Sequence, residues 1–251
     1  MARIIAICNQ KGGIGKTTTT VSLATGLMSL GKKTLVIDTD AQCNSTDTYK
    51  AETRKVATLY DLLLEDEPVE ECIQHTSIGD IIASDKLLKG AEQKFPQDPS
   101  RYFLLKNKCQ ELEDKYDYIL IDTPPVLGVI LSNVLTYARE CIIPFTCDRY
   151  ALQGVDELLH TIDSVKSYTN TDLKISGILI CKYHNNYRNH RKVAEQLPEI
   201  AKQLDTKVFN TKIRESIACS NSQAQRMSIF DYDKNCTTAK DYLDFCREIM
   251  E

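Results

Sequence analysis

Glycine and proline are scarce in this sequence, with ten and seven respectively among 251 residues. No stretch therefore has the low complexity of a disordered tail or a long linker. Also absent are an apolar run approaching the roughly 20 residues of a membrane span and the layout of a signal peptide at the N-terminal "MARIIAIC". These absences favour a globular protein of the cytoplasm, and we expect a single domain over residues 1–251 with a well-buried core.

The ten cysteines contain no C-x-x-C pair and no even framework of the kind found in disulfide-rich domains. The nearest approach to a metal pattern is Cys181 with His184, followed by His190, but the further ligands of a zinc site are missing at the right spacing. Other cysteines, such as Cys8 and Cys141, lie in apolar runs, where a free thiol acts as a small hydrophobe. This usage indicates a reducing compartment.

Apolar runs of strand length alternate with segments of helix length along the chain. We expect strands at residues 3–8, 33–38, 78–84, 116–122, 140–146 and 174–183. We expect helices at 15–30, 58–66, 99–115, 129–138, 151–168 and 237–251, the last within a mostly helical C-terminal part. The alternation predicts an α/β fold with a single doubly wound, mostly parallel sheet that helices cover on both faces. Pro198 in "EQLPEIAKQL" is a local conflict, because a helix across it should break or kink.

The stretch "CNQKGGIGKTTTT", residues 8–20, contains most of a phosphate-binding loop between an expected strand and an expected helix. Its glycines let backbone N–H groups turn towards phosphate oxygens, and the helix adds its positive N-terminal end. Lys16 can reach the β- and γ-phosphates, the Thr17 hydroxyl can bind Mg²⁺, and Thr18 can donate to an α-phosphate oxygen. The predicted nucleotide-binding residues are Lys11, Gly12, Gly13, Ile14, Gly15, Lys16, Thr17 and Thr18.

Three carboxylates follow expected strands. "LVIDTDAQ" places Asp38 and Asp40 after one strand, and "YILIDTPP" places Asp122 after another. Because ligands bind outside the carboxyl ends of parallel strands, all three can face the phosphates. Asp122 has the usual position of an acid that holds Mg²⁺ through water, and Asp38 or Asp40 could orient the attacking water. Asp38 is also a metal candidate, while the alternative for Asp38 and Asp122 is a structural cap on the next turn.

The phosphate-binding loop departs from the ordinary pattern G-x-x-x-x-G-K-[ST], because Gln10 replaces the first glycine and an additional lysine, Lys11, precedes Lys16 by five residues. "KGGIGKT", "DTDAQCNST" and "DTPP", in this order, resemble the deviant-Walker ATPases of the ParA/MinD group, in the SIMIBI class of P-loop NTPases. In that family the early lysine reaches the nucleotide of the other subunit. The resemblance implies an ATPase in which Lys16 serves its own site, Lys11 serves its partner's, and ATP with Mg²⁺ closes a sandwich homodimer.

The same resemblance implies the roles of the remaining residues. Thr17 and Asp122 would hold Mg²⁺, and Asp40 would position the attacking water, so that the catalytic set is Lys11, Lys16 and Asp40. A second cation that faces the phosphates would offset transition-state charge much as an arginine finger does. Because that cation arrives only with the second subunit, intrinsic turnover should be slow.

The resemblance covers nearly the whole chain and is nearest to the small ParA (Soj-like) partition proteins. It extends to "DRYALQGVDELLHTI" (148–162) and to the C-terminal region from "KIRESIACSNS" onward. Lys16 lies close to the start, so we expect no N-terminal helix-turn-helix extension. The resemblance implies a dimer that binds DNA without sequence preference on the nucleoid and is released when a ParB-like partner stimulates hydrolysis. Such a protein segregates plasmid, chromosome or mobile-element DNA.

A MinD-like or other cargo-positioning ATPase, acting as an adaptor at a membrane or a protein scaffold, is the alternative. MinD relatives end in a basic amphipathic helix, whereas "KDYLDFCREIME" holds four acids, so we expect no membrane binding. The nitrogenase iron-protein branch needs a cluster-ligating cysteine after the later strand acid. "DTPPVLGVILSN" contains none.

Positive charge is not in excess, because the formal net charge is −4, so DNA binding would need a local basic patch. Residues 173–194 contain no Asp or Glu and offer such a patch around "KYHNNYRNHRK", a loop that leads to a helix start. The candidate DNA-binding residues are Lys182, Arg188, Arg191 and Lys192, extended by Lys212, Arg214 and Arg226. Lys182 is also a candidate for the adenine pocket, and the alternative for the whole patch is a solvated basic face.

This patch departs from the Soj-like pattern at two positions where those proteins carry arginine. Ala218 stands at one of them, and Asn186 stands near the other, with Arg188 two residues away. We therefore expect shifted or weaker DNA contacts.

Overall fold

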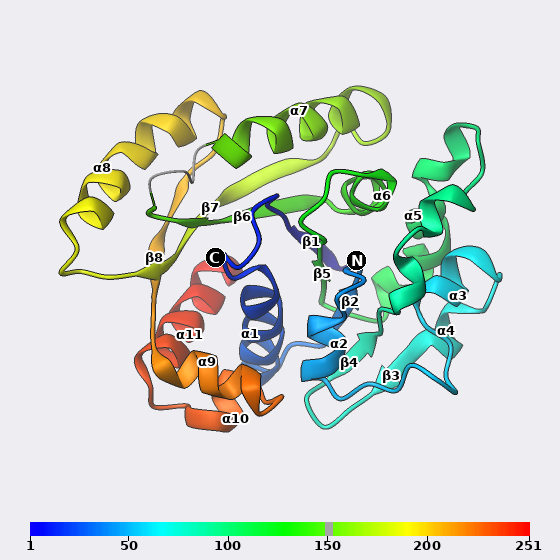
Figure 1. Ribbon diagram of the computed structural model, residues 1–251, viewed down its shortest axis with the longest axis horizontal. Helices are drawn as coiled ribbons and strands as arrows, with labels where there is room; N and C mark the ends of the chain where they lie inside the picture. The colour runs from blue at the N-terminus through cyan, green and yellow to red at the C-terminus, as the bar shows by residue number, and fades with distance from the viewer. Residues whose placement is uncertain (149–152) are drawn as a thin grey trace.

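The computed structural model describes residues 1–148 and 153–251, with side chains from residue 157 in the second part. Its described strands form one sheet in the order β3-β4-β2-β5-β1-β6-β7-β8 (Figure 1). The strands are β1 (Arg3–Ile7), β2 (Thr34–Asp38), β3 (Ile73–His75), β4 (Asp80–Ile82), β5 (Tyr118–Asp122), β6 (Glu140–Thr146), β7 (Lys174–Tyr183) and β8 (Val208–Arg214). Neighbouring strands pair in parallel except β3 and β4, which are antiparallel.

Helices cover both faces of this sheet (Figure 1). On one face lie α1 (Lys16–Ser29), α10 (Ile229–Asp233) and α11 (Thr237–Met250), and on the other α5 (Leu104–Cys109), α6 (Val129–Tyr137), α7 (Gln153–Tyr168) and α8 (Arg188–Gln203). The remaining helices are α2 (Asn44–Thr48), α3 (Leu59–Leu64), α4 (Val69–Cys72) and α9 (Ile217–Ala224), with short 3₁₀ turns at Lys86–Leu88, Ala91–Gln93, Pro99–Tyr102 and Gln110–Asp114. The predicted doubly wound, mostly parallel α/β fold is confirmed.

The continuous apolar character of the strands follows from this two-sided cover. Along β1, Ile4 and Ala6 join the larger buried cluster under α6 and α7, whereas Ile5 and Ile7 join the cluster under α1 and α11. Successive side chains of a strand point to opposite faces, so both sets must be apolar when both faces are buried. None of the helices in the described ranges is long and apolar enough to cross a bilayer.

The central place of β1 positions the functional loops. It lies between β5 and β6, and in the parallel registers Ile7 pairs with Asp122 and Asp38 pairs with Asp122. The carboxyl ends of β1, β2 and β5 are therefore level with one another. The loop after β1 meets the two strand-end aspartates at one edge of the sheet, as the sequence predicts.

Residues 99–115, expected as one helix, form a 3₁₀ turn, α5 and a second 3₁₀ turn. The break lies near Phe103, the N-cap of α5, whose backbone is not helical (φ −111°, ψ 1°). The side chain of Asn133 in α6 forms hydrogen bonds with the backbone at this break. Its Oδ1 accepts from Leu105 N at 3.2 Å, and its Nδ2 donates to Arg101 O at 2.7 Å. A tertiary contact thus replaces the helical hydrogen bonds, which is why the continuous helix is wrong.

The strands β3 and β8 and the helices α2 and α4 lie outside the predicted set. In addition, α8 continues through Pro198, where the sequence indicated a break. A proline inside a helix costs about 3 kcal/mol, and burial of Leu197 and Ala201 on either side of it offsets this cost by packing the helix on the sheet. The expected helix at 151–168 begins at Gln153, and residues 149–152 of the segment "DRYALQGVDELLHTI" lie outside the described residues.

Candidate nucleotide site

The loop between β1 and α1 has the backbone of a phosphate cradle. Gly13 (φ +73°) and Gly15 (φ +101°) adopt the left-handed conformation, in which a side chain would be strained. Gly15 is the N-cap of α1, and no side chain caps the first turn of that helix. The N–H groups at the start of α1 are therefore available to an anion, as expected for this motif.

The two lysines of the loop are directed to different places. Lys16 is 8% exposed, and its Nζ donates to the backbone oxygen of Lys11 at 3.1 Å, inside its own loop. Burial lowers the pKa of Lys16, although Asp122 and Asp40 oppose that shift. Lys11 leaves the loop instead, and its exposed Nζ donates to Oδ2 of Asp148, just beyond β6, at 2.5 Å. One lysine is thus built into its own site and the other is outside it.

Asp38 is fully buried and holds the segment after β2 in place. Its Oδ1 accepts from Asp40 N at 3.1 Å, and its Oδ2 accepts from both Thr46 N and Thr46 Oγ1 at 2.8 Å. Burial and the nearby Asp122 raise the pKa of Asp38. Both oxygens are already bound within the loop, so we keep Asp122, and not Asp38, in the candidate metal site.

Asp122 fits a magnesium site better. It is fully buried, its Oδ2 accepts from Ser45 Oγ at 2.8 Å, and its Oδ1 is buried without a hydrogen-bond partner. Burial raises the pKa of Asp122, while the hydrogen bond from Ser45 and the nearby Thr17 hydroxyl oppose the rise. An unsatisfied buried carboxylate oxygen is costly unless a cation or donor completes it. The neighbouring Thr17 hydroxyl and Asp122 are hard oxygen donors of the type that Mg²⁺ prefers.

Asp40 lies at the wall of the nucleotide cavity and is 9% exposed. Its Oδ1 accepts from Gln42 N at 2.9 Å, and Ser84 Oγ donates to its backbone oxygen at 2.7 Å. The second carboxylate oxygen has no hydrogen bond to any described residue. Asp40 can therefore accept a hydrogen bond from a water molecule in the cavity while its backbone stays in place.

The cavity next to the loop has a volume of about 490 Å³. The phosphate loop, Asp40 and Pro125 line one side of it, and the end of β8, the start of α9 and the start of α11 line the other. Lys182, which adopts the left-handed conformation (φ +53°) at the end of β7, also lines it. A role for Lys182 beside a nucleotide base stays a prediction.

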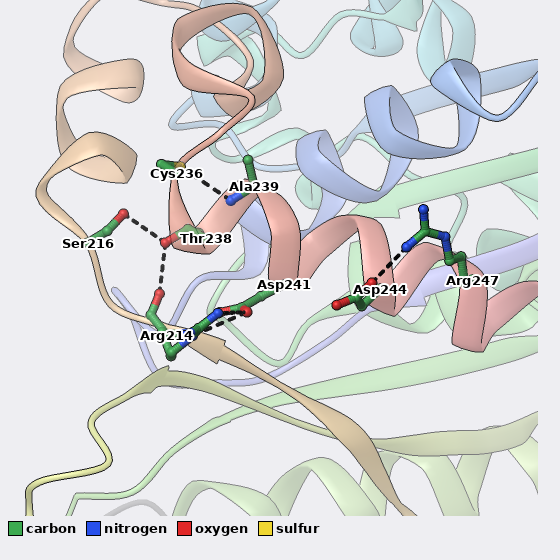
Figure 2. A network of polar contacts seen from close by, with 8 residues as sticks. All are labelled: Arg214, Ser216, Cys236, Thr238, Ala239, Asp241, Asp244 and Arg247. Atoms are coloured by element: carbon green, nitrogen blue, oxygen red, sulfur yellow. Dashed lines mark hydrogen bonds and ion pairs between the residues drawn. The ribbon is translucent and has the colours of Figure 1, made fainter.

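The far wall is held by a polar network that the sequence analysis did not foresee (Figure 2). Nε and Nη2 of Arg214 bind the Asp241 carboxylate of α11, and Ser216 Oγ and Thr238 Oγ1 lie 2.7 Å apart. Thr238 Oγ1 also donates to Arg214 O at 2.9 Å. Ala239 N donates to Cys236 Sγ at the start of α11. The side chain of Arg214, predicted as a DNA contact, is therefore bound to Asp241 at the wall of the cavity.

Gln223 of α9 is another member of the site that carries no sequence signal. Its Nε2 donates to Thr18 Oγ1 at 2.5 Å, so Thr18, expected to donate to a phosphate, has a protein partner in this structure. Arg226, a predicted DNA contact, forms an ion pair of 3.0 Å with Asp47 of α2. The first contact joins α9 to the phosphate-loop helix, and the second joins the turn after α9 to α2.

The basic patch is divided by the structure. Arg188, Arg191 and Lys192 begin α8, are exposed, and form no ion pair with any described residue. Lys212 lies apart from them on β8, over the ring of Tyr183 at 4.9 Å. Ala218 is half-buried against the apolar cluster under α1 and α11, and Asn186 is exposed in the loop before α8.

The sequence pattern of Cys181, His184 and His190 does not converge on one point. Cys181 is buried beside α1, whereas His184 Nε2 lies 2.6 Å from Glu215 Oε2 and His190 Nδ1 accepts from His184 N at 3.1 Å. Across residues 1–148 and 153–251, no group of three or more His, Cys, Asp and Glu side chains could hold a metal ion.

Comparison with known proteins gives a consistent result. A family model described as an AAA domain matches residues 2–175. The chain is 37% identical over 252 residues to the sporulation initiation inhibitor protein Soj of Bacillus subtilis, covering 99% of this chain and 98% of that protein. It is 35% identical over 254 residues to the chromosome partitioning protein ParA of Myxococcus xanthus, covering 100% of this chain and 89% of that protein.

Solved structures show the same likeness. A putative plasmid partition protein of Borrelia burgdorferi bound to AMPPNP matches with a TM-score of 0.83 and 28% identity, over 100% of this chain and 99% of that one. Cobyrinic acid a,c-diamide synthase from Mycobacterium smegmatis, with bound ATP analogue and magnesium, matches with a TM-score of 0.86 and 28% identity, over 100% of this chain and 95% of that one.

Proposed function

The chain belongs to the Soj/ParA family of partition ATPases, and on that premise we propose that it is a DNA-binding switch driven by ATP. ATP and Mg²⁺ are its ligands, as in the solved structures of similar chains. In the ATP state, two copies form a sandwich dimer that binds DNA without sequence preference. A ParB-like partner stimulates hydrolysis and releases the DNA, so that the protein works on the nucleoid in the cytoplasm.

The observation that carries this proposal is the separation of the two lysines. Lys16 Nζ lies under its own phosphate loop, where it meets the β- and γ-phosphates of the bound nucleotide. Lys11 Nζ lies outside that loop, 2.5 Å from Asp148, so it is free to serve a second site only after it leaves this contact. A lysine placed in this way completes the nucleotide site of a second copy better than its own.

The other residues take roles that follow from their contacts. Thr17 and the unsatisfied oxygen of Asp122 hold Mg²⁺, which neutralises phosphate charge when bound. The second carboxylate oxygen of Asp40 accepts a hydrogen bond from the attacking water and orients that water towards the γ-phosphate. Lys11 of the second copy adds positive charge opposite that water, which stabilises the transition state. Hydrolysis is therefore slow in the single chain and faster in the dimer.

The exposed cations at the start of α8 supply the DNA surface. Arg188, Arg191 and Lys192 are separate from the nucleotide cavity and form no ion pair with a described carboxylate. Free cations of this kind bind phosphates of any sequence and release counterions. A dimer presents the surface twice, and two linked contacts raise the apparent affinity for one DNA molecule without a new contact.

The experiment is DNA binding by the purified chain with ATP, with ADP and with no nucleotide, across a salt series. We expect binding to a non-specific duplex only with ATP and Mg²⁺, and loss of that binding as salt rises. Lys16→Ala, which cannot hold the phosphates, is the matched control and should not bind in any state. Equal binding in all three nucleotide states would refute the switch. No binding in any state would favour a positioning ATPase for another cargo.

A further inference from the structure

Four aromatic rings form a cluster at the junction of β7 and α8, outside the nucleotide cavity. The rings of His184 and Tyr187 are stacked, with centroids 4.5 Å apart and planes inclined by 25°. His190 meets Tyr187 edge to face at 5.2 Å, and it lies 5.9 Å from the ring of Tyr183. Neither the ATP site nor the phosphate contacts described above require such a cluster.

The inner members of the cluster are fixed. Tyr183 is buried, His184 Nε2 is bound to Glu215 at 2.6 Å, and His190 Nδ1 accepts from His184 N at 3.1 Å. Tyr187 is the outermost ring and is 55% exposed. Contacts with His184 and His190 therefore hold the Tyr187 ring in one orientation. Among the described residues, Tyr187 has no other ring partner.

Three cations follow this exposed ring in the chain. Arg188 is its neighbour, and Arg191 and Lys192 lie in the first five residues of α8, all exposed. No carboxylate occurs from residue 173 to residue 194. Two carboxylates from elsewhere approach the cluster and both are bound, Glu215 to His184 and Asp148 to Lys11. The surface around Tyr187 thus combines a rigid, exposed aromatic ring with unpaired positive charge.

We propose that Tyr187 is a stacking platform for unpaired bases, so that this surface binds single-stranded DNA through its bases as well as its phosphates. Cations alone would bind the backbone of any nucleic acid. A duplex keeps its bases stacked on one another, but a single strand can place a base on a protein ring, which proteins that hold single strands exploit. The inference rests on the proposed function, because it adds base contacts to the DNA surface assigned there.

The experiment compares three fluorescent ligands with the full chain in AMPPNP and Mg²⁺: an oligothymidine of about 20 nucleotides, longer than the roughly 4–16 nucleotides of typical single-strand sites, an abasic strand of equal length, and a duplex. The abasic strand has the same phosphates without bases. We expect the oligothymidine to bind about 5- to 150-fold more tightly than the abasic strand, from the strength of base–aromatic stacking. Tyr187→Leu should remove this difference, and Tyr187→Phe should retain it.

Several outcomes would overturn the inference. Equal affinity of the unmodified chain for the oligothymidine and the abasic strand would do so without any variant. A difference that survives in Tyr187→Leu would place the base contact elsewhere, and a difference lost in Tyr187→Phe would show that the ring itself is not the contact. The duplex arm is independent. A chain that prefers the oligothymidine but ignores duplex DNA would retain this inference and remove the proposed function.

Discussion

Nζ of Lys11 and Oδ2 of Asp148 lie 2.5 Å apart and join the phosphate loop to the segment after β6 within one subunit. Lys11 cannot hold this contact and reach a nucleotide in a second copy at the same time. The contact therefore competes with the proposed ATP-dependent dimer. Its strength is limited, because both side chains are partly exposed, at 39% and 44%, and exposed ion pairs contribute at most about 1 kcal/mol.

Asp148→Asn is expected to tighten the ATP-dependent dimer, by up to about 30-fold in the dissociation constant, since a stabilisation of up to about 1 kcal/mol is lost from each of the two monomers that form it. Sedimentation with AMPPNP measures this constant. Thr146→Val is a suitable control, because Thr146 Oγ1 donates to the same Asp148 oxygen at 2.7 Å but carries no charge. A weaker dimer in Asp148→Asn would show that Asp148 contributes to the interface itself.

Replacement of the two lysines should have different effects. Lys16→Ala should weaken ATP binding roughly 10- to 150-fold, because charge-assisted hydrogen bonds to phosphate contribute about 1.5–3 kcal/mol. Lys11→Ala should retain ATP binding and lose the dimer. Calorimetry with AMPPNP gives the first quantity and sedimentation gives the second. If Lys11→Ala lost as much ATP affinity as Lys16→Ala, both lysines would serve the same site.

Asp40→Ala is expected to bind ATP and to hydrolyse it at least about 100-fold more slowly, because the attacking water loses its acceptor. Because hydrolysis releases the protein, this variant should also stay on DNA. Phosphate release and dissociation from DNA measure the two effects. Asp40→Asn is the matched control, because an amide oxygen can still accept from Gln42 N and preserve the loop. Loss of ATP binding in Asp40→Ala alone would show that the loop, and not catalysis, had failed.

Neutral replacements of the cations of α8 should reduce the salt dependence of DNA binding. Each phosphate contact contributes about 0.9 to the slope of log K against log salt, so Arg188→Gln, Arg191→Gln and Lys192→Gln together should lower it by nearly 3 for each subunit that contacts the DNA. Fluorescence anisotropy over a salt series gives the slope. Lys55→Gln, Lys86→Gln and Lys89→Gln remove the same charge from other exposed positions and should leave it unchanged. A slope that falls equally in both triple variants would indicate only a general effect of net charge.

Glu140 provides a test of stability against pH, away from the nucleotide site. Burial alone would raise the pKa of Glu140, but hydrogen bonds from Arg3 and Ser176 outweigh it and lower the pKa below its usual 4.5. A carboxyl with a lowered folded pKa stabilises the fold above its unfolded pKa, and this stabilisation is lost as pH falls through the folded value. Glu140→Gln should therefore cost about 1–3 kcal/mol of unfolding free energy at pH 7.

Urea unfolding at pH 7 and below pH 4 measures this effect. The difference between the two proteins should shrink in acid, because the native carboxyl becomes protonated and its pairing with Arg3 weakens. A difference that does not change with pH would assign the cost to packing and not to charge.

The sequence predicts the parts of this fold whose signal is local. The apolar runs of β1, β2 and β5 and the glycines before α1 define both the parallel sheet and the phosphate loop. By contrast, α2 has the sequence "NSTDT", with no apolar side chain, and its place depends on Thr46 and Ser45 binding strand-end aspartates. The strand β8, "VFNTKIR" at the sheet edge, has no continuous apolar run and lies within a region expected to be mostly helical.

The site shows the same limit. Both lysines and all three aspartates could be selected from their spacing, but the binding of both Asp38 oxygens within the loop depends on Thr46, eight residues away in sequence. The commitment of Arg214 to Asp241 depends on a helix at the other end of the chain. Contacts between distant segments follow from how the helices pack, and composition alone does not encode them.

The way in which α8 packs on the rest of the protein also determines which of its residues can be replaced. Among its described side chains, Leu197 and Ala201 are buried, and the cations at its start touch no carboxylate. Residues on its outer face can therefore be exchanged by mutation without a cost to the core or to nucleotide chemistry. A cation two residues from a neutral position, as Arg188 is from Asn186, can supply positive charge to the same surface. We therefore expect DNA binding to depend on the total charge of this face and not on the position of any one cation.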